Sequence, residues 1–444
     1  MKERLFGTDG IRGTVGNEPM TADFALRLAS AAASALKLKG GKVVIGKDTR
    51  LSGYMFESAL EAGFVAAGVD VLLLGPLPTP GIARLTQELN ANLGVVISAS
   101  HNAFYDNGIK FFDSSGSKLT DEIEKQIEDQ INEKPMTVES SSLGKAKFID
   151  NARIRYQEFC SASLPRGKDL SGLKIVFDGA NGAGYKVGPR TLGNLGADVI
   201  PIGCSPNGRN INDGCGSTQP DLLQLTVKAL NADVGVALDG DGDRLVMVDE
   251  KGQIIDGDQL LYVLAMERFS ENKLRGPVVG TIMSNFGLEE ALERKKIDFH
   301  RTNVGDRNVL RELRKSGGVI GGETSGHMID LEKTTTGDGL ICALQVLAIM
   351  KKNQLKLSDL VSGMSKYPQT NINVEVKSNF NLEASRKIQD AISSAEAELL
   401  NKGRIVLRAS GTEPVVRVMV EGKNKDQIDI IAKQLAGVVA EFAS

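Results

Sequence analysis

Short apolar runs alternate with amphipathic helical patterns through the first quarter of the chain, and this alternation restricts the possible folds more than any other feature. A helical pattern over 22–38 precedes the apolar run 42–45, and a second one over 54–67 precedes the run 70–74. A proline-rich turn, another helical pattern and the buried run 93–97 follow. Strands separated by helices in this way imply parallel βαβ units. We therefore expect an α/β protein.

The same pattern recurs further along the chain. Residues 173–178 and 277–283 each form an apolar run that ends in small or polar residues and leads into a helical pattern. This recurrence predicts one diverged α/β unit that is used three times. From about Gln369 the pattern changes to that of a small α+β unit, with strands near 373–376, 404–407 and 415–420 and helices near 382–400 and 427–442.

Polar stretches at 133–147 and 249–258 separate these units. A chain of 444 residues is long enough for several domains. We place the domains at 1–150, 151–255, 256–368 and 369–444.

Charge and composition exclude several classes of protein. The formal net charge is -3, and the chain lacks the basic run that a nucleic-acid binder normally shows. No apolar stretch approaches the roughly 20 residues that span a bilayer, and the N-terminus has no apolar signal core. The 4 cysteines have no C-x-x-C spacing, which predicts free thiols. We expect a cytoplasmic protein with a small-molecule partner and with neither a nucleic-acid nor a membrane partner.

An acidic loop is the strongest local signal for chemistry. Asp239, Asp241 and Asp243 alternate with glycines, which allow a sharp loop to turn all three carboxylates toward one point. A cation is needed to neutralise such a cluster, and all-oxygen ligands suit Mg²⁺. The spacing also fits an EF-hand, but Arg244 stands where that loop requires glycine, so we reject the match. A solvated acidic turn is the alternative, and Arg244 suits a phosphate or sugar oxygen.

A serine-containing loop directly follows the buried run 93–97. It reads Ser98-Ala-Ser100-His101-Asn102 and is followed by Lys110. The carboxyl end of a parallel strand is where an open α/β sheet binds its ligand. The loop lacks the G-x-S-x-G elbow of serine hydrolases. Ser100 could therefore carry a phosphoryl group, with His101 and Lys110 supplying charge or protons, or the loop could simply cap the strand.

Three further loops combine glycine with groups that suit anions or sugars. Residues 6–13 and residues 408–414 offer backbone amides, hydroxyls and arginine to a phosphate, although each is also compatible with a plain turn. Residues 321–327 offer Glu, Ser and His to neighbouring sugar hydroxyls. The near-match of residues 41–47 to a nucleotide-binding P-loop is discarded, because Asp48 replaces the required Ser or Thr.

In this order, and spread over nearly the whole chain, the five loops resemble those of the α-D-phosphohexomutase superfamily. The resemblance implies a four-domain architecture around one central cleft. Three similar α/β domains would be followed by an α+β domain of the TATA-box-binding-protein-like kind. One loop would come from each domain, with the N-terminal loop as the fifth.

The resemblance also implies a role for individual side chains. Ser100 would be a phosphoserine, and its phosphate would hold one Mg²⁺ together with Asp239, Asp241 and Asp243. The other implied roles are catalysis for Arg12, His101 and Lys110, sugar binding for Thr8, Arg244, Glu323, Ser325 and His327, and phosphate binding for Arg408, Ser410, Gly411, Thr412 and Arg417.

The implied activity is phosphoryl transfer within a hexosamine phosphate. Glucosamine 6-phosphate and glucosamine 1-phosphate would interconvert through a phosphoserine enzyme and so supply UDP-N-acetylglucosamine synthesis. Glucose 1,6-bisphosphate or glucosamine 1,6-bisphosphate would be the activator or intermediate. Glucose and mannose phosphates are the alternative substrates within the superfamily, and a sugar-phosphate sensor without chemistry is an alternative outside it. A homodimer is one of the oligomeric states that the sequence leaves open.

Two positions depart from the superfamily pattern. Ala103 stands where proline is usual, and Thr324 stands where Gln, Asn or Met is usual. The first loosens the serine loop, and the second lies in the sugar loop and bears on which hexose is preferred.

Overall fold

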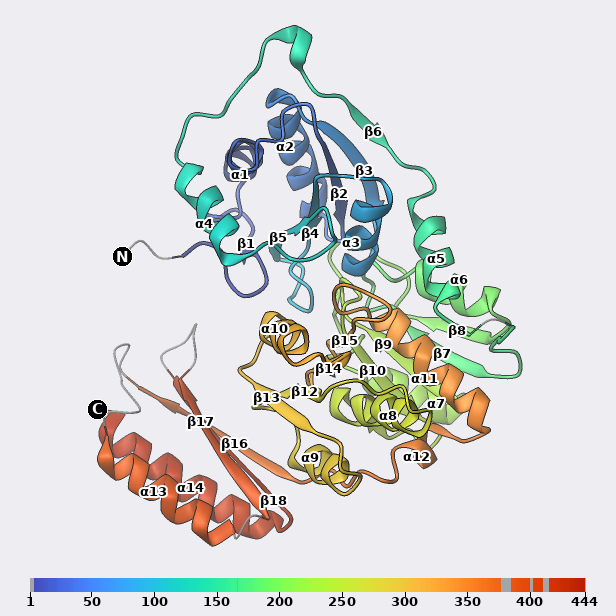
Figure 1. Ribbon diagram of the computed structural model, residues 1–444, viewed down its shortest axis with the longest axis vertical. Helices are drawn as coiled ribbons and strands as arrows, with labels where there is room; N and C mark the ends of the chain where they lie inside the picture. The colour runs from blue at the N-terminus through green and yellow to red at the C-terminus, as the bar shows by residue number, and fades with distance from the viewer. Residues whose placement is uncertain (1–3, 166, 377–384, 400–401, 410–414, 444) are drawn as a thin grey trace.

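The computed structural model describes residues 4–165, 167–376, 385–399, 402–409 and 415–443. These residues form four β-sheets in chain order, each packed against helices (Figure 1). The α/β pattern expected for the first three units and the α+β pattern expected for the last are both present.

The first sheet has six strands in the order β1-β5-β4-β2-β3-β6. Their bounds are Ile11–Thr14 (β1), Lys42–Lys47 (β2), Asp70–Pro76 (β3), Leu93–Ile97 (β4), Asp106–Asp113 (β5) and Ala146–Phe148 (β6). The helices are Ala22–Ala35 (α1), Ser52–Ala66 (α2), Thr79–Glu88 (α3) and Asp121–Gln130 (α4), and a short 3₁₀ turn spans Ser140–Ser142. Val43 and Ile45 of β2 pack with α1 and α2, whereas Val44 between them packs with α3. Because successive strand residues face opposite sides, helices cover both faces.

The expectation of parallel units needs one correction in this sheet. Strands β2, β3, β4 and β6 are parallel, but β5 runs antiparallel to β4, and β1 runs antiparallel to β5. The chain turns back directly after β4 through residues 98–105, whereas a parallel connection needs a longer crossover. The serine loop is therefore a turn between two antiparallel strands.

The second and third sheets repeat this arrangement. The second has the order β11-β10-β9-β7-β8, and the third has the order β13-β12-β14-β15. In each, a strand of the parallel part continues through a loop into an antiparallel neighbour: β9 into β10, and β14 into β15. The three loops so placed are the serine loop, the acidic loop and the sugar loop. The repeat predicted from the sequence thus positions one ligand loop per unit.

The bounds of these two units are as follows. The second contains Ala152–Ala162 (α5), Lys174–Asp178 (β7), Val187–Asn194 (α6), Asp198–Ile202 (β8), Asp221–Leu230 (α7), Val234–Leu238 (β9), Leu245–Asp249 (β10) and Ile254–Ile255 (β11). The third contains Gly257–Ser270 (α8), Val278–Thr281 (β12), Phe286–Glu293 (α9), Phe299–Thr302 (β13), Asp306–Ser316 (α10), Ile320–Gly322 (β14), Met328–Asp330 (β15), Gly339–Asn353 (α11) and Leu357–Leu360 (α12).

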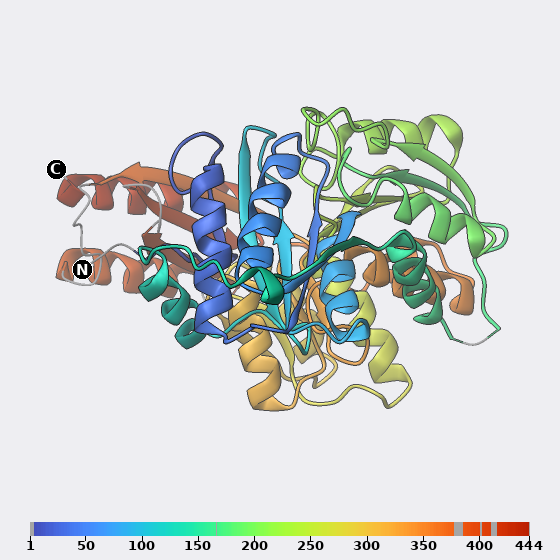
Figure 2. The same ribbon diagram turned by 90° about the horizontal axis from the view of Figure 1, so that it is seen from above.

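The fourth unit is an antiparallel sheet with helices on one face. Strands Gln369–Glu375 (β16), Gly403–Ala409 (β17) and Val415–Gly422 (β18) pair in the order β16-β18-β17 and pack against Arg386–Leu399 (α13) and Lys425–Ala443 (α14). Residues 382–384 and 400 of the predicted helix lie outside the described residues. Seen from above, this unit lies to one side of the first three (Figure 2). Among the described residues, no helix is long and apolar enough to cross a membrane, and all four cysteines are free thiols, as predicted.

A buried carboxylate at the start of α11 makes stability depend on pH. Asp338 accepts hydrogen bonds from Ile341 N (2.9 Å) and from Tyr156 Oη of α5 (2.8 Å). Burial raises its pKa to about 6 despite both bonds. The native state therefore binds more protons than the unfolded chain between the usual pKa of 3.8 and about 6, so stability falls as the pH rises through that window.

We expect Asp338→Asn to remove this dependence, because the amide keeps the shape without the charge. The difference in unfolding free energy between variant and wild type should move in the variant's favour by roughly 2 to 3 kcal/mol from pH 4 to pH 7. Urea unfolding of both proteins across this range measures it. A constant difference would show that Asp338 titrates normally in the native state.

Candidate active site

The backbone at Ser100 adopts a conformation that few non-glycine residues take. Its φ is +53°, in the left-handed region. Ser100 N donates to Ser98 Oγ (2.9 Å), and the Ser100 carbonyl accepts from Asn212 Nδ2 (3.0 Å) and from the Arg50 guanidinium (3.3 Å). Strained backbone of this kind persists only where the surroundings hold it. The turn after β4 therefore presents a fixed serine that is almost fully buried.

The group that supports Ser100 was missed by sequence reasoning. Arg50 is fully buried and forms an ion pair with Asp48, which in turn accepts from Ser98 Oγ (2.5 Å). In the sequence, Asp48 stands out only as the residue that breaks a P-loop pattern. The available signal was its position, because Asp48 directly follows β2, the strand beside β4 in the sheet.

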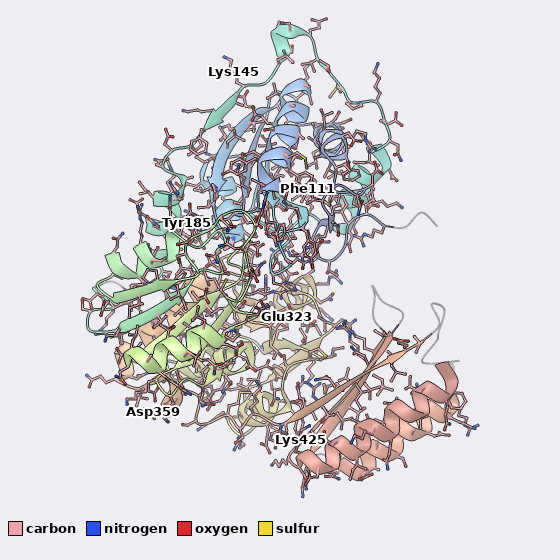
Figure 3. All side chains as sticks on the ribbon, turned by 180° about the vertical axis from the view of Figure 1, so that it is seen from behind. Phe111, Lys145, Tyr185, Glu323, Asp359 and Lys425 are labelled. Atoms are coloured by element: carbon pink, nitrogen blue, oxygen red, sulfur yellow. The ribbon has the colours of Figure 1, made fainter. Side chains whose placement is uncertain are left out.

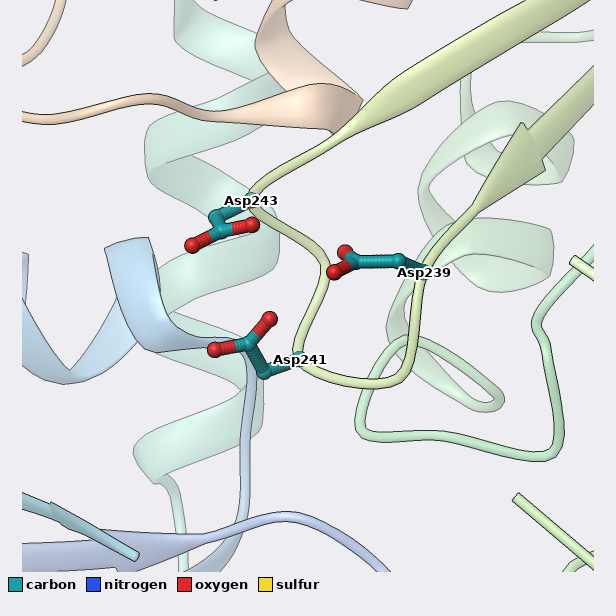
Figure 4. Close-up of side chains that lie close together, drawn as sticks. All are labelled: Asp239, Asp241 and Asp243. Carbon is teal, nitrogen blue, oxygen red and sulfur yellow. The ribbon is translucent and has the colours of Figure 1, made fainter. Parts of the chain in front are cut away.

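The three aspartates of the acidic loop point toward one another (Figure 4). They are buried, and their ligand oxygens lie within 4.8 Å of one another. Ser100 Oγ donates to Asp239 Oδ2 at 2.5 Å, which brings the serine and acidic loops together. Gly240 makes this approach possible, since a Cβ there would lie 2.5 Å from the Ser100 carbonyl oxygen.

These residues fit a divalent cation. Within the described part of the chain, Asp241 Oδ1 and Asp243 Oδ1 are buried without a hydrogen-bond partner. Burial, together with the charges of Asp243 and Asp241, raises the pKa of Asp239 well above its usual value. A bound cation would satisfy the unpaired oxygens and reverse this effect on the pKa. The all-oxygen donor set matches Mg²⁺.

Lys110 is the main positive charge at the cluster. Its Nζ lies 2.9 Å from Asp241 Oδ2 and 2.8 Å from Asp9 Oδ2. Burial lowers its pKa, but the charges of Asp241 and Asp9 outweigh burial, and the net pKa is raised. The lysine is therefore a fixed cation at neutral pH. Arg12 also pairs with Asp9, so the N-terminal loop joins the same group.

The sugar loop reaches this cluster through His327. Its Nδ1 is 3.7 Å from Asp243 Oδ1, and an isolated β-bridge joins His327 to Arg244. Burial lowers the pKa of His327, but Asp243 and Asp306 raise it to about 9. Glu323 lies near the centre of the molecule, between the first and third sheets (Figure 3), and accepts from Gly305 N at 2.9 Å. Ser325 is exposed.

The remaining sequence-predicted residues are placed as follows. His101 is half-buried, and burial followed by the nearby charges of Arg244 and Arg12 lowers its pKa to about 4. Thr8, which precedes Asp9 in the N-terminal loop, is exposed. Thr324, the unusual residue of the sugar loop, donates to buried Asp258 Oδ2 at 2.7 Å, so its hydroxyl is used within the protein.

The predicted phosphate loop is described only in part. Arg408 and Arg417 face each other as register partners in β17 and β18, in the sheet that lies apart from the serine loop (Figure 1). Ser410, Gly411 and Thr412 lie outside the described residues.

Comparison with known protein families covers almost the whole chain. Residues 3–137, 155–252 and 256–367 match the alpha/beta/alpha domains I, II and III of phosphoglucomutase/phosphomannomutase, and residues 372–438 match its C-terminal domain. The chain belongs to the phosphoglucomutase/phosphomannomutase family. Curated members similar to it include the phosphoglucosamine mutases of Nitrosococcus oceani, 55% identical over 99% of this chain and 98% of the relative, and of Methylococcus capsulatus, 53% identical over 100% of both.

Solved structures share this fold. A phosphoglucomutase/phosphomannomutase family protein from Burkholderia thailandensis has a TM-score of 0.81 at 24% identity, covering 99% of this chain and 98% of that one. An Aspergillus fumigatus N-acetylphosphoglucosamine mutase, solved with GlcNAc-6P and magnesium, has a TM-score of 0.70 at 19% identity, covering 99% and 96%. In this family member, loops from the three α/β units meet at the buried Ser100 and at the aspartates that fit a metal ion.

Proposed function

We propose that this protein is a phosphoglucosamine mutase that interconverts glucosamine 6-phosphate and glucosamine 1-phosphate. The observation that carries the proposal is the meeting of Ser100 Oγ, three buried aspartates and Lys110 within one cluster. Relatives that are 51% to 55% identical over nearly the full chain bear this enzyme name, which supports glucosamine over glucose or mannose.

Ser100 is the proposed phosphoryl carrier. In the forward direction, O1 of glucosamine 6-phosphate attacks the phosphorus of phosphorylated Ser100. The new P–O1 bond forms as the P–Oγ bond breaks, which yields the 1,6-bisphosphate and leaves the electron pair on Ser100 Oγ. In the return step, Ser100 Oγ attacks the 6-phosphoryl group as the P–O6 bond breaks, O6 takes up the proton that O1 gave up, and glucosamine 1-phosphate remains. Such transfers depend on in-line positioning and on neutralising the oxygens of the moving group.

The surrounding side chains meet these two requirements. Lys110 and Arg12 would stabilise the charge of the moving group, because Lys110 stays protonated beside Asp241. Neutral His101 is available to take the proton that the attacking sugar hydroxyl gives up. Asp239, Asp241, Asp243 and the serine phosphate would hold Mg²⁺, which supplies Lewis-acid stabilisation of the phosphoryl oxygens when bound.

The remaining loops would select and orient the sugar. We propose Thr8, Arg244, Glu323, Ser325 and His327 as sugar ligands. The proposed ligands of the phosphate that does not react are Arg408, Ser410, Gly411, Thr412 and Arg417. The bisphosphate must reorient before the second transfer, and we propose that movement of the C-terminal domain, residues 369–444, gates this step. The other proposed domains are 1–150, 151–255 and 256–368. A charged sugar phosphate is a cytoplasmic metabolite, and we place the enzyme there.

A coupled assay that compares three sugar 6-phosphates tests the proposed substrate. With Mg²⁺ and a trace of bisphosphate, we expect kcat/KM for glucosamine 6-phosphate to exceed that for glucose 6-phosphate and mannose 6-phosphate by at least roughly tenfold, as expected of a site that binds the amino group by hydrogen bonding. Preference for glucose or mannose would instead assign the alternative mutase activities. No turnover of any of the three would contradict the proposal.

A further inference from the structure

A closed ring of ion pairs with alternating charge runs through the candidate active site. It joins the N-terminal loop, the strand β5, the acidic loop and the sugar loop. Its six ion-pair distances are Lys110 Nζ to Asp9 Oδ2 (2.8 Å), Asp9 Oδ1 to Lys118 Nζ (2.5 Å), Lys118 Nζ to Asp306 Oδ2 (2.5 Å), Asp306 Oδ2 to His327 Nε2 (3.5 Å), His327 Nδ1 to Asp243 Oδ1 (3.7 Å) and Asp243 Oδ2 to Lys110 Nζ (3.8 Å).

Lys118 is the member of this ring that links the first unit directly to the third. Its side chain is only 9% exposed, and its ammonium lies between two carboxylates of different units, Asp9 of the first and Asp306 of the third. Burial lowers the pKa of Lys118, but Asp306 and Asp9 outweigh burial and raise it. The lysine therefore stays charged, and its ammonium is committed to these two carboxylates.

Each of these carboxylates holds residues to which the proposed function gives a role. Asp9 is the shared counter-ion of Arg12, Lys110 and Lys118, so its position between them sets where Lys110 lies relative to the aspartates. Asp306 begins α10 and contacts His327, while the preceding residue, Gly305, donates to Glu323. Lys118 thus links the cations beside Ser100 with the two sugar-loop residues.

Other contacts at the border between the first and third units already hold these units together. Arg307 pairs with Asp121 and Glu124 of α4, Arg314 donates to Ser117 Oγ (3.0 Å), and Thr335 donates to the Gly116 carbonyl (2.6 Å). These contacts do not involve the ring. Their presence means that loss of Lys118 leaves the border between the two units largely intact.

We infer that Lys118 is a positioning residue for phosphoryl transfer, which acts through Asp9 on Lys110 and Arg12 and through Asp306 on His327. The inference rests on the proposed mutase function and adds a residue to it. The Lys118 ammonium pairs with Asp9 and Asp306, so it acts through these carboxylates rather than on the sugar. Among the ion pairs of the described residues, its loss leaves Asp9 with two cations instead of three and Asp306 with His327 alone, so the groups beside Ser100 move relative to the sugar loop.

Lys118→Met tests this inference, because it keeps an unbranched side chain that is one atom shorter and removes the charge. The full-length variant is phosphorylated on Ser100 with the bisphosphate and then mixed with glucosamine 6-phosphate, and loss of phosphate from the protein is followed by quench and mass spectrometry. We expect the transfer rate and kcat to fall roughly 10- to 100-fold, the range that misplacement of about 1 Å causes, while KM changes less than about threefold.

Arg307→Met is the matched control. It removes a partly buried cation that forms ion pairs with Asp121 and Glu124 of α4 rather than with members of the ring. Lys125→Met removes the charge of an exposed lysine of α4. Both should keep transfer rates within about threefold of the wild type, which is the spread expected of unrelated positions. Asp306→Asn keeps the shape of the acid and should slow transfer as Lys118→Met does. It replaces Lys118→Met as the test if Lys118→Met does not fold.

The outcomes separate the inference from the proposed function. A wild type that transfers no phosphate to the sugar contradicts the proposed function and the inference with it. If the wild type is active, three results would overturn the inference alone. Lys118→Met, or Asp306→Asn in its place, could keep the wild-type transfer rate; Arg307→Met could lose as much of the transfer rate as Lys118→Met; or Lys118→Met could change only KM.

Discussion

Replacing Ser100 by alanine is expected to reduce mutase turnover by at least roughly 10⁴-fold, because removal of a covalent nucleophile leaves only binding and charge stabilisation. The fold should persist. Alanine has no larger side chain than serine, and the backbone at φ +53° is held by bonds to the Ser100 amide and carbonyl, which the substitution keeps. The lost bond from Oγ to Asp239 is worth about 1 kcal/mol.

The measurement is turnover of glucosamine 6-phosphate beside circular dichroism and thermal unfolding. Ser141→Ala, the same change at an exposed serine of the 3₁₀ turn, is the matched control and should be fully active. A Ser100→Ala protein with near-normal turnover would contradict the phosphoserine assignment, whatever its stability.

Asp241→Asn has the second largest expected effect. The amide keeps the bond from Thr79 Oγ1 (2.7 Å) but removes a charge from the proposed metal site and from the ion pair with Lys110. Charge stabilisation by a metal is worth several kcal/mol, so we expect a loss of about a hundredfold or more in kcat. The concentration of Mg²⁺ that gives half-maximal rate should also rise.

Magnesium titration of the rate distinguishes this effect from general damage. Asp129→Asn, at an exposed aspartate of α4, should follow the wild-type titration. If Asp241→Asn retains full activity in the presence of a chelator, the metal site is placed wrongly.

Much of the fold could be predicted from the sequence because short runs of neighbouring residues determine its strands and helices. Strand β4, Leu93–Ile97, has the bounds that the sequence predicts, since five apolar residues between turn signals leave few alternatives. The direction of β5 could not be predicted from the run that forms it, because a strand reads the same in parallel and antiparallel pairing. That direction is decided by the short serine loop, which is too short for a crossover.

In the candidate site too, residues close together in the sequence could be predicted, whereas residues far apart could not. The aspartates at 239, 241 and 243 are close in sequence, and their glycine spacing already predicted convergence, which the structure shows. Lys118 and Asp306 lie 188 positions apart and have no unusual neighbours in the sequence, so only the tertiary fold brings them together. Arg50 was missed for a similar reason, since it supports Ser100 through backbone carbonyls rather than through a recognisable motif.

The location of the transferable phosphate is the most direct test of the account. Purified protein is incubated with glucosamine 1,6-bisphosphate, digested and examined by tandem mass spectrometry before and after glucosamine 6-phosphate is added. We expect one phosphate, on the peptide that contains Ser100, and its loss when the monophosphate is supplied. Phosphate on another residue, or an active preparation in which Ser100 never carries phosphate, would contradict the account.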